Sequence, residues 1–301
     1  MGQSLDKKTA HFYGQFVQAA YTMFKNPKGP DPLRPEPDGI PPGYELGAWI
    51  HMSDFILDIA EPKFYGIVVH SVADPNSRII AIRGTEGLIE WMDDAAAIPV
   101  PFRQVPAAGK VAYGFDKIYS TMTVVKRDLP GAPPRTAGVP PETFTGSFAE
   151  QLEQLAIRRE AERGLKPLST DGSIRQKRPT IVAAHSLGAA LATLFVMEND
   201  SKRKFDVSTS CTFASPRVGN TEFVHLFNQL PIVSWRIVNT RDIVPKLPPH
   251  IPIVLDFNHV DIACPFDSSV FAKNSLVCWH SMDTYQHWLD LTSPLPPECV
   301  P

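Results

Sequence analysis

A strand-like segment that turns directly into an alanine-rich helix limits the folds open to this chain. Residues 179–185 (PTIVAAH) are almost continuously apolar, which is typical of a strand buried on both faces of a parallel sheet. The residues AHSLG (184–188) follow and open a helical pattern over 187–199. Strands that pass into helices in this way build β–α units, so the segment predicts an α/β protein with a mostly parallel central sheet.

The same alternation of strand and helix patterns continues along the chain. Proline-rich stretches interrupt it, and the proline-rich region 129–178 predicts an insertion or a cap. No boundary divides the pattern, so we expect residues 1–301 to form a single domain. Strands are expected near 65–72, 79–83, 208–214 and 233–239, and helices near 6–24, 114–128, 150–163, 220–229 and 281–291.

Composition narrows the classes of function. Hydrophobic residues make up 43% of the 301 residues and charged residues 20%, which is typical of a globular protein. The formal net charge of −3 argues against charge-driven nucleic-acid binding. The most apolar stretch, 181–197, is shorter than the ~20 residues of a membrane span. The first residues show no apolar signal segment, so the compartment stays open.

Four cysteines are too few for a disulfide framework. Cys211 lies in a strand-like apolar run, which favours a buried free thiol. Cys264 and Cys278 are near enough in sequence to pair, and the sequence leaves open whether they do.

Ser186 has the setting of a nucleophile elbow, a tight strand-to-helix turn that exposes a serine hydroxyl at the edge of a sheet. The turn requires small residues two before and two after the serine; Gly188 meets this requirement and Ala184 nearly does. The elbow also makes the backbone N–H of Leu187 a donor for an oxyanion. The alternative is a serine that only caps the helix.

A serine nucleophile needs a base and an acid that orients the base. Asp242 follows the strand-like run 233–239 and is the candidate acid. Of the histidines after it, His280 precedes a terminal helix and is the candidate base, with His259 as its rival. The other two are interpreted as a loop residue, His250, and a packing residue within the helix, His287.

With these motifs the chain resembles the class 3 lipases. This family comprises the fungal-type triacylglycerol lipases and also includes feruloyl esterases and plant phospholipases. The resemblance extends from about residue 60 to about residue 290. It is carried by IRGTEGLIEWMDD (82–94), VAYGFDKIY (111–119), IVAAHSLGAALATL (181–194), TFASPRVGN (212–220), VNTRDIVPKLPP (238–249) and WHSMDTYQHWL (279–289).

The resemblance implies an α/β-hydrolase fold with a Ser–His–Asp triad. It implies that Thr85, the residue after the RG pair, supplies an oxyanion donor beside that of Leu187. It further implies that residues 86–101 form a short lid after an early strand. The lid residues expected to contact substrate are Leu88, Ile89, Trp91 and Met92, and the alternative is that this segment is an ordinary buried helix.

These features predict a serine carboxylic ester hydrolase, a triacylglycerol lipase or carboxylesterase that works through an acyl-enzyme. The same residues fit a phospholipase A1 or a feruloyl or polyester esterase, and a relative that binds lipid or a partner without catalysis is an alternative of another class. The chemistry needs no metal and no cofactor. The expected partner is a lipid or small ester at a lipid–water interface, with no nucleic acid and no transmembrane segment. A monomer or a dimer is expected.

Overall fold

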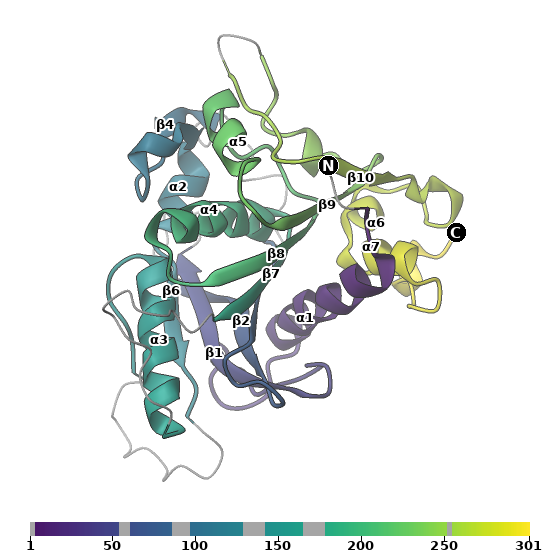
Figure 1. Cartoon of the computed structure of the whole chain (residues 1–301). Helices are drawn as coiled ribbons and strands as arrows, with labels where there is room; N and C mark the ends of the chain where they lie inside the picture. Colours follow the sequence, from purple (N-terminus) through teal and green to yellow (C-terminus); the bar gives the residue numbers. More distant parts are fainter. Residues whose placement is uncertain (1–3, 54–60, 86–96, 129–141, 165–177, 252–254) are drawn as a thin grey trace.

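The computed structural model describes residues 4–53, 61–85, 97–128, 142–164, 178–251 and 255–301. Its strands form an eight-stranded sheet and a small two-stranded sheet (Figure 1). The large sheet has the order β10-β9-β8-β7-β3-β2-β1-β6, and β4 pairs with β5. The strands are β1 (Tyr44–Ser53), β2 (Pro62–Ser71), β3 (Arg78–Ile82), β4 (Pro99–Pro101), β5 (Lys110–Ala112), β6 (Thr123–Lys126), β7 (Pro179–His185), β8 (Asp206–Phe213), β9 (Val233–Asn239) and β10 (Ala263–Phe266).

The part of the sheet around the expected elbow is parallel. β3, β7, β8, β9 and β10 pair with one another in parallel, whereas β2, β1 and β6 extend the sheet beyond β3 in antiparallel pairs. The predicted α/β fold with a mostly parallel sheet is therefore confirmed. Parallel strands end at the same edge of the sheet, so the residues that follow β3, β7 and β9 meet there. Those residues include Thr85, Ser186 and Asp242.

Helices cover both faces of the large sheet (Figure 1). One apolar core lies between the sheet and α2 to α5, and a second lies between the sheet and the pair α1 and α7. Nearly every residue of α4 up to Asn199 is buried, so this helix lies inside the first core. The helices are α1 (Lys7–Lys25), α2 (Tyr113–Tyr119), α3 (Phe148–Glu162), α4 (Leu187–Lys202), α5 (Thr221–Phe227), α6 (Leu276–His280) and α7 (Met282–Leu289).

The prediction of one helix over 114–128 is wrong. Helix α2 ends at Tyr119, and residues Thr123–Lys126 form β6, which pairs with β1 at the edge of the sheet. The β-branched residues of this segment favour a pleated strand, and the pairing with β1 overrides the helical pattern before it. Strand β1 itself lies in a stretch where the sequence pattern predicts no element.

The proline-rich region 129–178 contributes to the first core, between the sheet and α2 to α5, through residues 142–164. There Ser147 caps α3 in a reciprocal capping box with Glu150, and Leu152 and Leu155 are buried in the core beside α4. Within the described ranges, no helix combines the length and the hydrophobicity that crossing a membrane requires.

The cysteines pair differently from the possibility raised by sequence spacing. Cys278 in α6 forms a disulfide with Cys299 near the C-terminus, and Cys264 is a free thiol on β10. Cys264 lies alongside Ile237 of β9, whereas the last residues of the chain return to α6. The prediction of a buried free thiol at Cys211 is confirmed.

Gly188 allows α4 to approach the neighbouring strand closely. A Cβ atom at this position would lie 2.5 Å from the Arg83 carbonyl oxygen and 2.6 Å from the Ile82 carbonyl oxygen. Both are backbone atoms at the end of β3, so no side-chain rotation can relieve the overlap. Helix α4 can therefore pack this close to β3 only because Gly188 has no side chain.

We expect Gly188→Ala to lower the free energy of unfolding by about 1–3 kcal/mol through overpacking. The loss would occur although alanine favours a helix over glycine by about 1 kcal/mol. Chemical denaturation at neutral pH measures the effect. Gly43→Ala is the control, because a Cβ there meets nothing within 4 Å and only the positive φ of +84° opposes it. A Gly188→Ala protein at least as stable as the wild type would contradict the packing argument.

Candidate active site

Ser186 occupies the turn between β7 and α4. Its backbone has φ 58° and ψ −129°, a conformation that costs a residue with a side chain about 1–3 kcal/mol. The Ser186 N–H donates to the Phe213 carbonyl oxygen of β8 at 2.9 Å, which holds the turn to the sheet. Leu187 is the first residue of α4, where backbone N–H groups have no partner within the helix. The turn thus has the geometry that the elbow pattern predicts.

Asp242 and His280 meet at the same edge of the sheet. His280 Nδ1 lies 2.7 Å from Asp242 Oδ2, and both residues are buried. Because an ionised carboxylate only accepts hydrogen bonds, this contact assigns the ring proton to Nδ1. In the neutral ring, the other nitrogen, Nε2, then carries a lone pair.

The expected base lies against the residue that precedes the expected nucleophile. The His280 ring packs against the ring of His185, the residue before Ser186, with centroids 4.5 Å apart. Among the described residues, neither His280 Nε2 nor Ser186 Oγ has a hydrogen-bond partner, although both atoms are buried. Buried polar atoms without partners are uncommon and point to a functional site.

The other histidines of the C-terminal region bind backbone carbonyls away from Asp242. His259 Nε2 lies 2.7 Å from the Pro245 carbonyl oxygen. His250 and His287 contact carbonyl oxygens through Nδ1 in the same manner. Among the candidate bases it is therefore His280 that the structure brings to Asp242.

The carboxylate of Asp242 has two further donors that the sequence analysis missed. Tyr285 on α7 donates its hydroxyl hydrogen to Oδ2 at 2.8 Å, and the Val244 N–H donates to Oδ1 at 2.9 Å. Tyr285 is fully buried, so burial and the neighbouring Asp242 raise its pKa well above the usual value and keep the phenol protonated. No sequence motif marks Tyr285, because only the packing of α7 brings it to the loop after β9.

Asn239, the last residue of β9, joins the segments that hold the acid and the candidate base. Its side-chain Nδ2 donates to the Trp279 carbonyl oxygen at 2.7 Å and contacts the Ser268 hydroxyl at 2.8 Å. The Asp242 N–H donates to the Asn239 carbonyl oxygen. One buried asparagine, through its side-chain amide and its backbone carbonyl, therefore holds the backbone at both members of the pair.

Thr85 follows the end of β3, and its neighbour Gly84 touches the serine. A Cβ atom on Gly84 would lie 2.6 Å from Ser186 Cβ and 3.1 Å from Ser186 Oγ. The residue before the expected oxyanion donor Thr85 therefore contacts the expected nucleophile directly. The expected lid residues Leu88, Ile89, Trp91 and Met92 lie outside the described residues.

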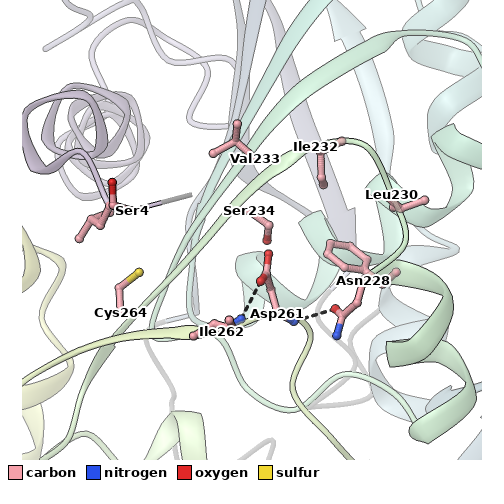
Figure 2. Close-up of a pocket in the computed structure, with 11 residues that line it drawn as sticks. Ser4, Asn228, Leu230, Ile232, Val233, Ser234, Asp261, Ile262 and Cys264 are labelled. Atoms are coloured by element: carbon pink, nitrogen blue, oxygen red, sulfur yellow. Dashed lines mark hydrogen bonds between the residues drawn. The ribbon is translucent and has the colours of Figure 1, made fainter. Parts of the chain in front are cut away.

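A surface pocket of about 530 Å³ lies elsewhere on the molecule (Figure 2). Its lining includes Val233 and Cys264, near the starts of β9 and β10, together with Asp261 and Asn228. It is thus at the opposite edge of the sheet from Ser186. Within the described ranges, no group of three or more His, Cys, Asp or Glu side chains could hold a metal ion.

Comparison with known proteins identifies the class. The sequence pattern of the Lipase (class 3) family matches residues 79–251, more than half of the chain. The chain therefore belongs to the class 3 lipase family. It is 29% identical over 219 residues to phospholipase A1-II 4 of Oryza sativa subsp. japonica, which covers 69% of this chain and 49% of that protein. A shorter match of 69 residues at 44% identity joins it to lipase ZK262.3 of Caenorhabditis elegans, covering 22% of this chain and 20% of that protein.

Solved structures have the same fold. A Rhizomucor miehei lipase in a propeptide complex superimposes with a TM-score of 0.56 at 18% identity, covering 88% of this chain and 68% of that one. An MDLA mutant from Penicillium cyclopium gives a TM-score of 0.55 at 18% identity, covering 86% and 78%. The fold is thus that of the α/β-hydrolase lipases. The chain spans about half the length of the curated phospholipase A1 relatives from rice that it matches.

We expect His259 to destabilise the fold in acid. Burial lowers its pKa to about 3, and the nearby Arg236 and Arg217 contribute. The unfolded chain takes up this proton near pH 6.5 and the folded chain does not, so the free energy of unfolding falls as the pH falls below that value.

The measurement compares His259→Gln with the wild type by urea unfolding between pH 7 and pH 4. Glutamine keeps a donor toward Pro245 and cannot titrate. The variant should gain about 1 kcal/mol relative to the wild type for each pH unit between 6 and 4. A stability difference that does not change with pH would show that His259 titrates normally.

Proposed function

We propose that this protein is a serine carboxylic ester hydrolase in which Ser186 is the nucleophile, His280 the base and Asp242 the residue that orients it. The observation that carries the proposal is the buried 2.7 Å contact between His280 Nδ1 and Asp242 Oδ2, next to the turn that contains Ser186. Membership of the class 3 lipase family supports it. The roles follow from the atoms that each side chain presents.

In the proposed reaction, His280 Nε2 removes the proton of Ser186 Oγ as the oxygen attacks the ester carbonyl carbon. The carbonyl electron pair moves to the oxygen and gives a tetrahedral oxyanion. Collapse of this intermediate breaks the bond to the alcohol, and His280 returns the proton to the leaving oxygen. Water, deprotonated by the same nitrogen, then attacks the acyl-enzyme and releases the acid.

The backbone N–H groups of Thr85 and Leu187 are the proposed donors to the oxyanion. Leu187 opens α4, where the helix dipole adds to the stabilisation of negative charge. Thr85 follows the strand next to β7, and the residue before it, Gly84, packs against Ser186. Each such donor typically contributes about 10²–10³ to the rate.

Ser186→Ala should lower kcat by about 10⁶, as removal of the nucleophile does in other serine triads. His280→Ala should lower kcat by several orders of magnitude. His259→Ala, which removes the rival histidine, is the matched control and should retain most of the activity. Hydrolysis of p-nitrophenyl esters at pH 8 measures all three. If activity survives Ser186→Ala, Ser186 is not the nucleophile. If His259→Ala is inactive while His280→Ala is active, His259 and not His280 is the base. A wild type that is inactive toward every ester would favour the non-catalytic, lipid-binding alternative.

Acylglycerols are the proposed substrates, because the family is that of the class 3 lipases. Phospholipids are the second candidate, since several relatives are phospholipases A1. Feruloyl and polyester esters would use the same three side chains. The lid proposed for residues 86–101 follows Thr85 directly in the chain, so its position can control access to the oxyanion site.

Rates on tributyrin taken through its solubility limit test both proposals. A lid that opens at an interface predicts a rise of roughly tenfold or more above the limit, lost in Ile89→Ser/Trp91→Ser. Simple saturation without a break would argue for an esterase of dissolved substrates. The same preparation is assayed on phosphatidylcholine vesicles, where a higher kcat/KM than on tributyrin would place phospholipids first.

A further inference from the structure

The peptide groups around Gly84 are held from both sides. The Gly84 N–H donates to the hydroxyl oxygen of Tyr21 at 2.8 Å. The Gly84 carbonyl oxygen accepts from Arg83 Nη1 at 2.7 Å. Because the carbonyl of Gly84 and the N–H of Thr85 belong to one planar trans peptide, the direction of one sets the direction of the other. The Arg83 contact therefore sets the direction of the Thr85 N–H, and the Tyr21 contact fixes the preceding Arg83–Gly84 peptide, from which the Gly84–Thr85 peptide continues.

The Arg83 side of this clamp is rigid. Its guanidinium is buried and donates through Nε and Nη2 to the Phe64 carbonyl oxygen. It also lies between two rings, 3.4 Å from the centroid of Phe24 on α1 and 4.2 Å from that of Tyr65 on β2. These cation–π contacts and hydrogen bonds hold the guanidinium in a single orientation.

The Tyr21 side of the clamp extends to the nucleophile turn. Tyr21 Oη lies 2.8 Å from His185 Nδ1, and the two rings meet edge to face. Burial lowers the pKa of His185 well below its usual value, and the neighbouring His280 contributes. The neutral imidazole has one acceptor nitrogen, so the Tyr21 hydroxyl can accept from Gly84 and donate to His185.

We propose that Tyr21 is a positioning residue that aligns the Thr85 N–H with Ser186 for the oxyanion of the reaction. The inference rests on the proposed function. A single hydroxyl joins the residue before the oxyanion donor to the residue before the nucleophile, and Gly84 itself packs against Ser186. Tyr21 comes from α1, which lies outside the segment 79–251 that matches the family.

The effect should appear in the transition state and not in substrate binding. A donor aimed at the oxyanion position acts only when the carbonyl oxygen has become tetrahedral and negative. Loss of the Tyr21 hydroxyl would release the Arg83–Gly84 peptide, and a shift of Gly84 would change the aim of the Thr85 N–H that follows it. The ring that fills the space remains in Tyr21→Phe. A misaimed donor therefore costs kcat and leaves KM nearly unchanged.

The experiment compares Tyr21→Phe with Tyr13→Phe, which removes the same hydroxyl about two turns earlier on α1. Each variant is measured for kcat and KM on a p-nitrophenyl ester. Each is also titrated with a trifluoromethyl ketone, which adds to the serine as a tetrahedral oxyanion, and with an ether analogue of the ester, which cannot. Thermal unfolding shows that each variant is folded at the assay temperature.

For Tyr21→Phe we expect kcat to fall by about 10- to 100-fold, less than the loss of a whole donor. The inhibition constant of the ketone should rise by a similar factor, and both KM and the affinity for the ether analogue should stay within about twofold. Tyr13→Phe should match the wild type in all four quantities.

Either of two results with Tyr21→Phe would overturn the proposal. Unchanged kcat and ketone affinity in Tyr21→Phe would make the contact purely structural, and equal losses for the ketone and the ether analogue would place Tyr21 in the substrate pocket. If Tyr21→Phe does not fold, His185→Asn and His185→Leu decide, because asparagine keeps an acceptor for Tyr21 and leucine does not. Equal kcat values for these two would also overturn it. Wild-type turnover and its loss in Ser186→Ala are measured first and test the proposed function separately.

Discussion

The contact between α4 and the end of β3 is the constraint on which the candidate site depends. Gly188 brings the helix against the carbonyl groups of Ile82 and Arg83, where no side chain would fit. Since β3 is the parallel neighbour of β7, the same contact brings Gly84 against Ser186. Both glycines are required here by close packing and not by a left-handed backbone. The serine and the strand end beside it are thus positioned as one unit.

A second set of contacts positions the acid and the base. Asn239 binds the carbonyl of Trp279, directly before His280, while Asp242 binds back to the carbonyl of Asn239. The disulfide at Cys278 joins the short helix α6 to the end of the chain. The pair is therefore held through backbone groups on both sides, which is how a loop can carry a side chain in one fixed orientation.

The helical layer of α1 and α7 contributes more than a cover for the sheet. It supplies two tyrosine hydroxyls at the functional edge, Tyr21 toward Gly84 and His185, and Tyr285 toward Asp242. Both side chains come from helices that also bury apolar residues in the second core. The packing of this layer therefore fixes polar contacts at the site as well as the stability of the fold.

The sequence by itself determined the elements that depend on neighbouring residues. The apolar run 179–185, its small flanking residues and the helix after it are local patterns, and β7 spans the expected residues. The choice of His280 over His259 rests on a contact to Asp242 across 38 residues, and Tyr21 reaches His185 across 164. No local pattern records such distances, because they result from how helices pack on the sheet. The sequence named His280 as the candidate base, but the contact that joins it to Asp242 is a result of tertiary structure, which alone decided which tyrosine meets the turn.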